Sequence, residues 1–360
     1  YVIRSYFQQK GSIMNIIKSL KSASISAKKY SAQLFADAVL NTTGDSDLSP
    51  GMKIFYDTAL LRNVGSQTYF AQFGKQQPLP KHSGKKVEWR KWNTFTVSTV
   101  PLQEGITPTG DKLGQTSIEA EIHQYGRYAT VADVLALTHL DDVIGGATEL
   151  FGDLASETMD IVTRNSVMTE AVKNVLFPRK SDGTAVASRD KLDNTCQLTP
   201  RVINKAVAIL KKNKAPKIND SYIGIIHPSV SFDLRDSKGW EEAHKYSATK
   251  EIFNGEIGEL HGVRFVESPN AKVYADNCPV GYSVYSTLIF GKDAWGVVKP
   301  DGASLKMIVK QVGSSGASDP LEQRGSVGFK FSTASAVLYP TRLLSIETVS
   351  AEFANDDEAN

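Results

Sequence analysis

The chain has 360 residues, of which 41% are hydrophobic and 22% charged, the composition of a globular protein with a sizeable core. The net charge of +2 does not indicate a nucleic-acid-binding protein, and two distant cysteines without C-x-x-C spacing argue against a disulfide framework or a zinc site. No run of 18 apolar residues is present, so we expect no membrane span.

Residues 1–67 form a predicted N-terminal arm. The first 36 residues are rich in serine and contain six basic side chains but no acidic one, and apolar residues recur at roughly helical spacing. We expect a basic arm that is helical at best in part, and Met14 is a candidate for the natural start. The basic residues considered for contact with a partner are Lys18, Lys21, Lys28 and Lys29.

Two segments then alternate with the period of a β-strand. Val87, Trp89, Phe95, Val97 and Thr99 occupy odd positions, and mostly charged or polar residues occupy the even ones; residues 116–123 alternate in the same way. Two alternating strands around a turn rich in glycine and proline predict a β-hairpin, whose arms of about 15 residues would reach roughly 50 Å. Such a ribbon is only marginally stable alone and needs a surface to lie on.

The turn, LQEGITPTGDKLGQ (residues 102–115), nearly matches the loop that binds nucleotide phosphates. We reject that interpretation because Asp111 stands where the lysine should follow the second glycine, and Leu113 replaces the hydroxyl that would hold magnesium. The segment that follows also alternates as a strand, whereas a phosphate loop opens a helix. We instead expect Glu104, Asp111 and Lys112 to be exposed near the end of the ribbon and to contact a neighbouring chain.

The first strand of the ribbon carries the motif KHSGKKVEWRKW (residues 81–92), in which basic and aromatic residues alternate. Such a ribbon could stack on nucleic-acid bases, or it could contact another protein whose acids face its charges. We favour protein contact, because a ribbon that projects from a core usually packs on another chain. The candidate contact residues are Lys85, Lys86, Trp89, Arg90, Lys91 and Trp92.

The strongest helical pattern covers residues 141–177 and is followed by Pro178. At 1.5 Å per residue this helix would be roughly 54 Å long. A second helix is expected from Thr199, as N-cap, to residue 216, followed by strands at residues 221–228, 262–268 and 281–291. The last clear element covers residues 325–350, where Val327, Phe329, Phe331 and Thr333 alternate. The fold class is therefore α+β. No H-E-x-x-H, G-x-S-x-G or G-x-G-x-x-G motif is present, so we expect no enzymatic activity, cofactor or metal.

The order of these parts resembles the Hong Kong 97-like major capsid proteins of tailed phages. Residues 79–92, 101–108, 125–135 and 319–347, together with the long helix, resemble the N4-type major capsid family more closely. The resemblance covers about residues 65–350. It implies an N-terminal arm (1–67), an extended β-hairpin loop region (68–127), a peripheral domain (128–198) with a spine helix at about 141–177, an axial domain (about 199–310), a return to the peripheral domain (311–353) and an acidic tail (354–360).

The function implied by this resemblance is that of a structural major capsid protein. Copies of the chain would form hexameric and pentameric capsomers and then an icosahedral shell around phage double-stranded DNA, assembled in the bacterial cytoplasm and retained in the virion. Implied partners are scaffold, portal and decoration proteins, with packaged DNA on the inner face near the basic arm. Two alternatives stay open: an encapsulin-type nanocompartment with the same fold, and a nucleic-acid-binding module that uses residues 81–92.

Overall fold

The structure is a computed structural model that describes residues 40–41, 68–80, 84–102, 104–105, 107, 110–138, 143–237, 240, 256–300, 305–314, 319–321, 323–353 and 359–360. The predicted arm lies outside the described residues except for Leu40–Asn41, so Lys18, Lys21, Lys28 and Lys29 are not among them. Within the described part, no helix has the length and hydropathy needed to cross a bilayer.

The chain divides into two units, which we describe separately. The smaller unit contains Tyr1–Gly51, Tyr128–Ile144 and Val309–Val327. In it, β1 (Leu40–Asn41) pairs in parallel with the end of β5 (His123–Ala132), and α4 (Asp133–Thr138) follows directly. The backbone amide of Asp133 donates to the carbonyl of Gln323 at 3.0 Å, which ties the start of α4 to the segment before β14.

The larger unit contains Met52–Arg127, Gly145–Ile308 and Gly328–Asn360. Its first sheet places β5, β14 (Arg324–Val337), β12 (Trp295–Pro300) and β2 (Lys75–Leu79) side by side in that order, and β13 (Lys306–Lys310) also pairs with β14. The long β14 confirms the alternating strand predicted in this region: Val327, Phe329, Phe331 and Thr333 are all buried.

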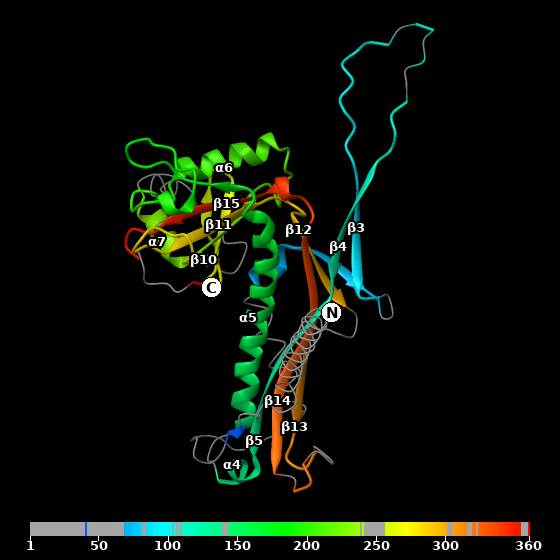
Figure 1. Cartoon of the computed structure of the whole chain (residues 1–360), viewed down its shortest axis with the longest axis vertical. Coiled ribbons are helices and arrows are strands. Elements are labelled where there is room, and N and C mark those ends of the chain that lie inside the picture. Colours follow the sequence, from blue (N-terminus) through cyan, green and yellow to red (C-terminus); the bar gives the residue numbers. More distant parts are fainter. Residues whose placement is uncertain are drawn as a thin grey trace, which may run out of the picture. The chain divides into compact units, whose positions relative to one another are not determined.

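Helix α5 (Val143–Ala171) runs beside β14 in Figure 1. The ring centroids of Phe151 and Phe329 lie 6.0 Å apart, and the Ser166 hydroxyl donates to the Ser335 carbonyl at 2.7 Å. The predicted long helix is thus confirmed, but it is 29 residues long, about 43 Å, and ends before Pro178. It stops because the chain turns to form β6 (Val175–Leu176), which pairs with β15 far along the sequence.

Strands β3 (Lys86–Trp92) and β4 (Gln115–Glu121) form the predicted hairpin, with Lys86 opposite Glu121 and Trp92 opposite Gln115. The prediction that the first strand continues to Thr99 is wrong. Pairing ends with the bond from the Asn93 amide to the Gly114 carbonyl, at 2.9 Å. The sequence between residues 101 and 114, through which the chain returns to β4, contains prolines and glycines and is poorly suited to continue a ladder. Beyond Asn93, Figure 1 shows a long loop.

A second sheet of seven strands forms the core of the rest of the larger unit. Its order is β6, β15, β11, β7, β9 and β8, and β10 pairs with β11. The predicted strands at residues 221–228, 262–268 and 281–291 are confirmed within it. The strand bounds are Leu343–Val349 for β15, Val284–Phe290 for β11, Tyr222–Ile226 for β7, Val263–Glu267 for β9, Glu256–Leu260 for β8 and Val273–Tyr274 for β10.

Helices α6 (Pro200–Lys212) and α7 (Pro228–Asp236) accompany this sheet. The apolar face of α6, which includes Ile203 and Leu210, belongs to the same buried cluster as Tyr222 and Ile289 of the sheet. Strands β7, β11 and β15 are buried along their whole length, as expected of strands covered on both faces. Thr199 takes the predicted N-cap position of α6, although its side chain makes no capping bond.

Asp160 on α5 is a buried carboxylate that fixes the segment before the first sheet. It accepts a hydrogen bond from the amide of Phe70, in α3 (Tyr69–Phe73), at 2.8 Å, while the Phe70 carbonyl accepts from the Trp295 indole at 3.0 Å. Burial raises the pKa of Asp160 to about 6, although the Phe70 amide and the buried Arg164 both favour its charged form. The ionised form of Asp160 therefore destabilises the native state above pH 6.

This raised pKa predicts that the free energy of unfolding falls as pH rises from about 4 to 7, because the folded state holds a proton that the unfolded state releases. Asp160→Asn keeps an oxygen acceptor for Phe70 and should flatten this dependence. Asp160→Ala loses the acceptor and should cost about 1–3 kcal/mol at every pH in this range. Urea unfolding of the unassembled chain between pH 4 and 8 measures both effects. Asp153→Asn, at an exposed position of the same helix, is the control and should leave the pH dependence unchanged.

Candidate interface site on the ribbon

The ribbon formed by β3 and β4 is anchored at its root to the first sheet. Val87 and Ala120 are buried against Val298 and Ala334, and the half-buried Trp89 packs against the same cluster. The Trp89 ring lies so close to Gly296 that a Cβ there would stand 2.8 Å from the ring carbon Cζ2. A glycine at this point of β12 is therefore what lets an indole lie flat across the strand.

The packing at the root has a cost at the indole nitrogen. Nε1 of Trp89 is buried and has no hydrogen-bond partner among the described residues. An unsatisfied buried donor of this kind is unfavourable, so the ring is retained for its apolar contact area. Trp89 packs against its own sheet and is half-buried there, so its contact with a neighbouring chain stays a prediction.

The basic residues of the ribbon are largely neutralised by glutamates of the same ribbon. Lys86 pairs with Glu119 at 3.0 Å, Arg90 pairs with Glu88 at 3.2 Å, and Lys85 pairs with Glu121. These partners raise the pKa of Lys86 and lower the pKa of the Glu88 and Glu121 carboxyls.

Lys91 has a different partner, since its ammonium lies 5.2 Å from the centre of the Tyr339 ring.

Because the lysine–glutamate and arginine–glutamate pairs of the ribbon are exposed, they contribute little to stability. They do remove most of the positive field that a nucleic-acid-binding ribbon would need, so this alternative loses its main support.

The far part of the ribbon is exposed and apolar. Glu104, Asp111 and Lys112 are exposed there, as expected. Of the large apolar side chains that surround them, the sequence analysis singled out only Trp92 as a contact, although the alternation at residues 95–99 indicated one apolar face. The exposed apolar residues of this segment, which we call the distal loop (residues 92–114), are Trp92, Phe95, Val97, Val100, Leu102 and Leu113.

So many large apolar side chains on one segment are characteristic of a surface that another molecule covers. Trp92 is 64% exposed, and Val97, Val100 and Leu102 are each more than 75% exposed. The predicted site residues therefore fall into two groups. Lys85, Lys86, Trp89, Arg90 and Lys91 belong to the root and the paired strands, and Glu104, Asp111 and Lys112 belong to the distal loop. Trp92, the last residue of β3, lies at the border between the two groups.

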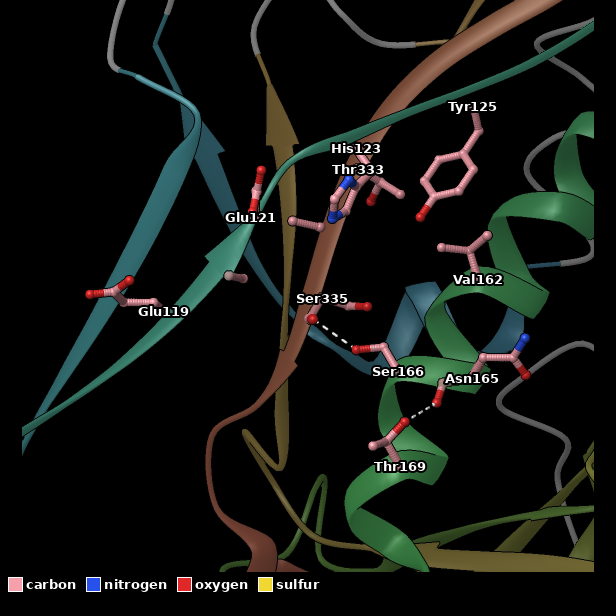
Figure 2. Close-up of a pocket in the computed structure, with 12 residues that line it drawn as sticks. Glu119, Glu121, His123, Tyr125, Val162, Asn165, Ser166, Thr169, Thr333 and Ser335 are labelled. Carbon is pink, nitrogen blue, oxygen red and sulfur yellow. Dashed lines mark hydrogen bonds between the residues drawn. The ribbon is translucent and has the colours of Figure 1, made fainter. Parts of the chain in front are cut away.

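A polar groove of about 620 Å³ lies beside the root, where α5 faces the start of β5 and the end of β14. Figure 2 shows Glu119, Glu121 and His123 on one side and Asn165, Ser166 and Thr169 on the helix. The Ser166 and Thr169 hydroxyls donate to the carbonyls of Ser335 and Asn165, at 2.7 and 2.9 Å. These two hydroxyls are directed to the backbone and not to His123, so neither is activated as a nucleophile.

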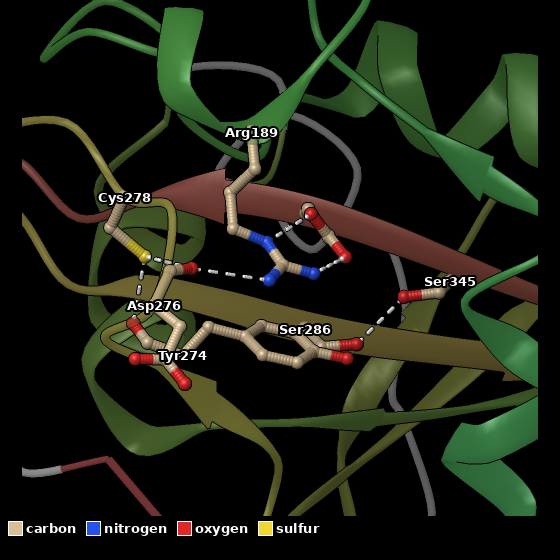
Figure 3. Close-up of polar contacts among 7 residues, drawn as sticks. Arg189, Tyr274, Asp276, Cys278, Ser286 and Ser345 are labelled. Atoms are coloured by element: carbon tan, nitrogen blue, oxygen red, sulfur yellow. Dashed lines mark hydrogen bonds and ion pairs between the residues drawn. The ribbon is translucent and has the colours of Figure 1, made fainter. Parts of the chain in front are cut away.

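A second polar cluster lies in the seven-stranded sheet (Figure 3). Arg189 binds Glu347 through two hydrogen bonds, of 2.6 and 2.8 Å, and its guanidinium stacks 3.5 Å from the centre of the Tyr274 ring. Glu347 is almost fully buried. Burial raises the pKa of the nearby Cys278 thiol, which donates to the Tyr274 carbonyl at 3.0 Å. A thiol with a raised pKa is a poor nucleophile, so the cluster fits a structural role.

Comparison with known proteins gives a consistent result. Residues 125–294 match the sequence family described as phage capsid protein. No curated protein sequence matches the chain. Among solved structures, the capsid of Ralstonia phage GP4 is similar with a TM-score of 0.61 and 13% identity, over 91% of this chain and 100% of that one.

Two cyanophage structures are similar as well. The capsid of cyanophage P-SCSP1u has a TM-score of 0.57 and 17% identity, over 86% of this chain and 93% of that one. The capsid of cyanophage Pam1 has a TM-score of 0.59 and 13% identity, over 88% and 100%. These likenesses confirm the predicted Hong Kong 97-like α+β fold.

The close approach at the root predicts that Gly296→Val displaces the Trp89 ring and loosens the ribbon. The amides of β3 and β4 should then exchange with deuterium at least tenfold faster, as measured by mass spectrometry of the unassembled chain. Gly110→Ala is the matched control, because a Cβ there meets nothing within 4 Å. If Gly296→Val leaves exchange in both strands unchanged, the ribbon is not anchored through this contact.

The Arg189–Glu347 pair predicts a large effect of removing only one charge. Arg189→Ala leaves a buried carboxylate without its partner and should lower the free energy of unfolding by about 3–5 kcal/mol. The double variant Arg189→Met with Glu347→Leu should recover most of that loss. Arg90→Ala removes an exposed pair and should cost less than about 1 kcal/mol in the same urea titration. Equal losses for Arg189→Ala and Arg90→Ala would contradict this assignment.

Proposed function

We propose that this chain is the structural major capsid protein of a tailed bacteriophage, and that its copies assemble into the icosahedral shell around the double-stranded DNA genome. The observation that carries the proposal is the capsid fold over nearly the whole chain, joined to a family match at its centre. The finer assignment to the N4-type family rests on the stretches at residues 79–92, 101–108, 125–135 and 319–347.

The physical basis of assembly is the distal loop. Its large apolar side chains lack cover within the described residues, and a two-stranded ribbon gains little stability by itself. We propose that a neighbouring copy covers Trp92, Phe95, Val97 and Leu102, while Glu104, Asp111 and Lys112 form the polar rim of that contact. Many copies of a modest contact then hold each subunit at several interfaces at once.

The domain assignment follows from the same proposal. We propose that the axial domain is built on the seven-stranded sheet, most of which comes from residues 199–310. The sheet also takes β6 and β15 from segments assigned to the peripheral domain, so the two domains would share strands. Helix α5 would be the spine of the peripheral domain.

The proposed partners are further copies of the chain, in hexameric and pentameric capsomers, together with scaffold, portal and decoration proteins and the packaged DNA. Assembly would take place in the bacterial cytoplasm, and the product would be the virion capsid. The role is structural, without catalysis. Electron microscopy of the purified chain, alone and co-expressed with a scaffold protein, should show shells, rings or capsomers. A monomer under all these conditions would contradict the proposal.

The apolar distal loop predicts a separable effect on assembly. Val97→Asp combined with Leu102→Asp should abolish shells and capsomers in electron microscopy, because both charges would be buried against a neighbour. Thermal unfolding of the unassembled chain should stay within about 0.5 kcal/mol of the unchanged protein, since both positions are exposed. Thr96→Asp adds a charge to the same segment without removing an apolar side chain, and should impair assembly much less. Normal shells from the double variant would rule out the distal loop as the contact.

A further inference from the structure

Four lysines in the last turn of α6 and in the loop after it form no ion pair with a described residue. Lys211 and Lys212 occupy the last turn of the helix, and Lys214 and Lys217 follow in the next loop. All four are exposed, and none pairs with a carboxylate among the described residues, in contrast to the basic residues of the ribbon. The Lys217 ammonium donates to the backbone carbonyl of Asp220, at 2.7 Å.

Two other segments bring further cations to the same place. The amide of Lys292 donates to the Pro216 carbonyl at 2.9 Å, and the Asn213 side chain donates to the Thr341 carbonyl at 3.1 Å. Arg342 then donates to the Lys292 carbonyl at 2.9 Å. These bonds fix three basic segments beside one another. The resulting α6-end surface consists of Lys211, Lys212, Lys214, Lys217, Lys292 and Arg342.

Few of the described acidic groups lie close to this surface. Asp220 and Asp293 lie in the same loops, and the Asn174 side chain, which donates to the Pro340 carbonyl at 2.8 Å, brings the internally paired Glu170 and Lys173 near its border. Among the residues that the structure describes, six cations therefore lie near two unpaired acids, in a chain whose net charge is only +2. The surface concentrates positive charge well above the average of the protein.

Lys214 supplies an independent observation. It adopts a φ of +54° directly after the C-cap of α6, a position where glycine is usual because a side chain is strained there. The strained turn is held by the bond from the Ala215 amide to the Leu210 carbonyl, at 3.0 Å. A lysine at this position has a conformational cost, which a charge contact with a partner would offset.

The composition of the surface favours nucleic acid over protein. Protein interfaces have an apolar core, but none of the described exposed large apolar residues lies at residues 205–220, 291–293 or 339–342. Tyr339 is covered by Arg342, 3.7 Å from its ring centre, and by Lys91. Its ring is therefore not free to stack on a base, which points to contacts with phosphates and not with bases.

We propose that the α6-end surface binds the phosphate backbone of double-stranded DNA without sequence preference. This inference rests on the proposed function, because a shell around a genome presents such a surface with a dense array of phosphates. Each cation that meets a phosphate releases a condensed counterion, so binding should weaken steeply with salt.

The test measures binding of the unassembled full chain to a random-sequence DNA duplex by fluorescence anisotropy between 50 and 200 mM salt. The combined variant Lys211→Gln, Lys212→Gln, Lys214→Gln and Lys217→Gln should bind at least tenfold more weakly. The slope of log K against log salt should become shallower by about 3 to 4. The ribbon variant Lys85→Gln, Lys86→Gln and Arg90→Gln is the control and should bind as the unchanged protein does. Unchanged binding by the α6-end variant, or an equal loss in the ribbon variant, would overturn the proposal.

Electron microscopy of the same variants separates this inference from the proposed function. If the α6-end variant forms shells and binds DNA more weakly, the result supports both the DNA-binding surface and the proposed function. Shells together with unchanged DNA binding would overturn the DNA surface alone, whereas failure of the unchanged protein to assemble would contradict the proposed function. If the α6-end variant fails to assemble but binds DNA normally, the partner is an acidic surface of a second copy, for which Glu149, Asp153 and Glu157 of α5 are the exposed candidates.

Discussion

A two-stranded ribbon cannot stabilise itself, and most of the architecture follows from that constraint. At its root, β3 and β4 gain stability by laying Trp89 across the backbone of β12 at Gly296. Beyond Asn93 the ladder ends, and a segment with exposed Val97 and Leu102 continues without such support. The root of the ribbon is thus held by the chain's own sheet, whereas we propose that a second molecule covers the exposed apolar surface of the distal loop.

The polar interior serves the opposite purpose and makes the scaffold rigid. Asp160 holds the backbone of Phe70, and Arg189 holds Glu347 inside the seven-stranded sheet. Buried charges of this kind contribute little net stability, but breaking one partner is costly, so they favour a single arrangement of the elements they join. A shell subunit that carries a ribbon by its root benefits from such a fixed base, because each contact must recur in the same geometry in every copy.

Local pattern predicted the elements well but not where long-range pairing would end them. The alternation that begins at Val87 located β3 correctly. The same alternation extends to Thr99, past the end of the ladder, because nothing in this strand reveals that the segment across the turn is a poor pairing partner. Helix α5 likewise ends before Pro178 because Val175 pairs with Ser345, a contact that no local signal reveals. The basic motif at residues 81–92 was misleading for a similar reason: Glu119 and Glu121, which neutralise it, lie some thirty residues later and meet it only through the hairpin register. The α6-end surface was hidden from sequence reasoning because its cations come from three separate segments.

We propose that a neighbouring copy covers the distal loop in an assembled shell. Hydrogen–deuterium exchange of residues 93–114 can be compared between the unassembled chain and purified shells. We expect fast exchange in the unassembled chain and strong protection of this segment in shells. Shells in which residues 93–114 exchange as fast as in the free chain would contradict it.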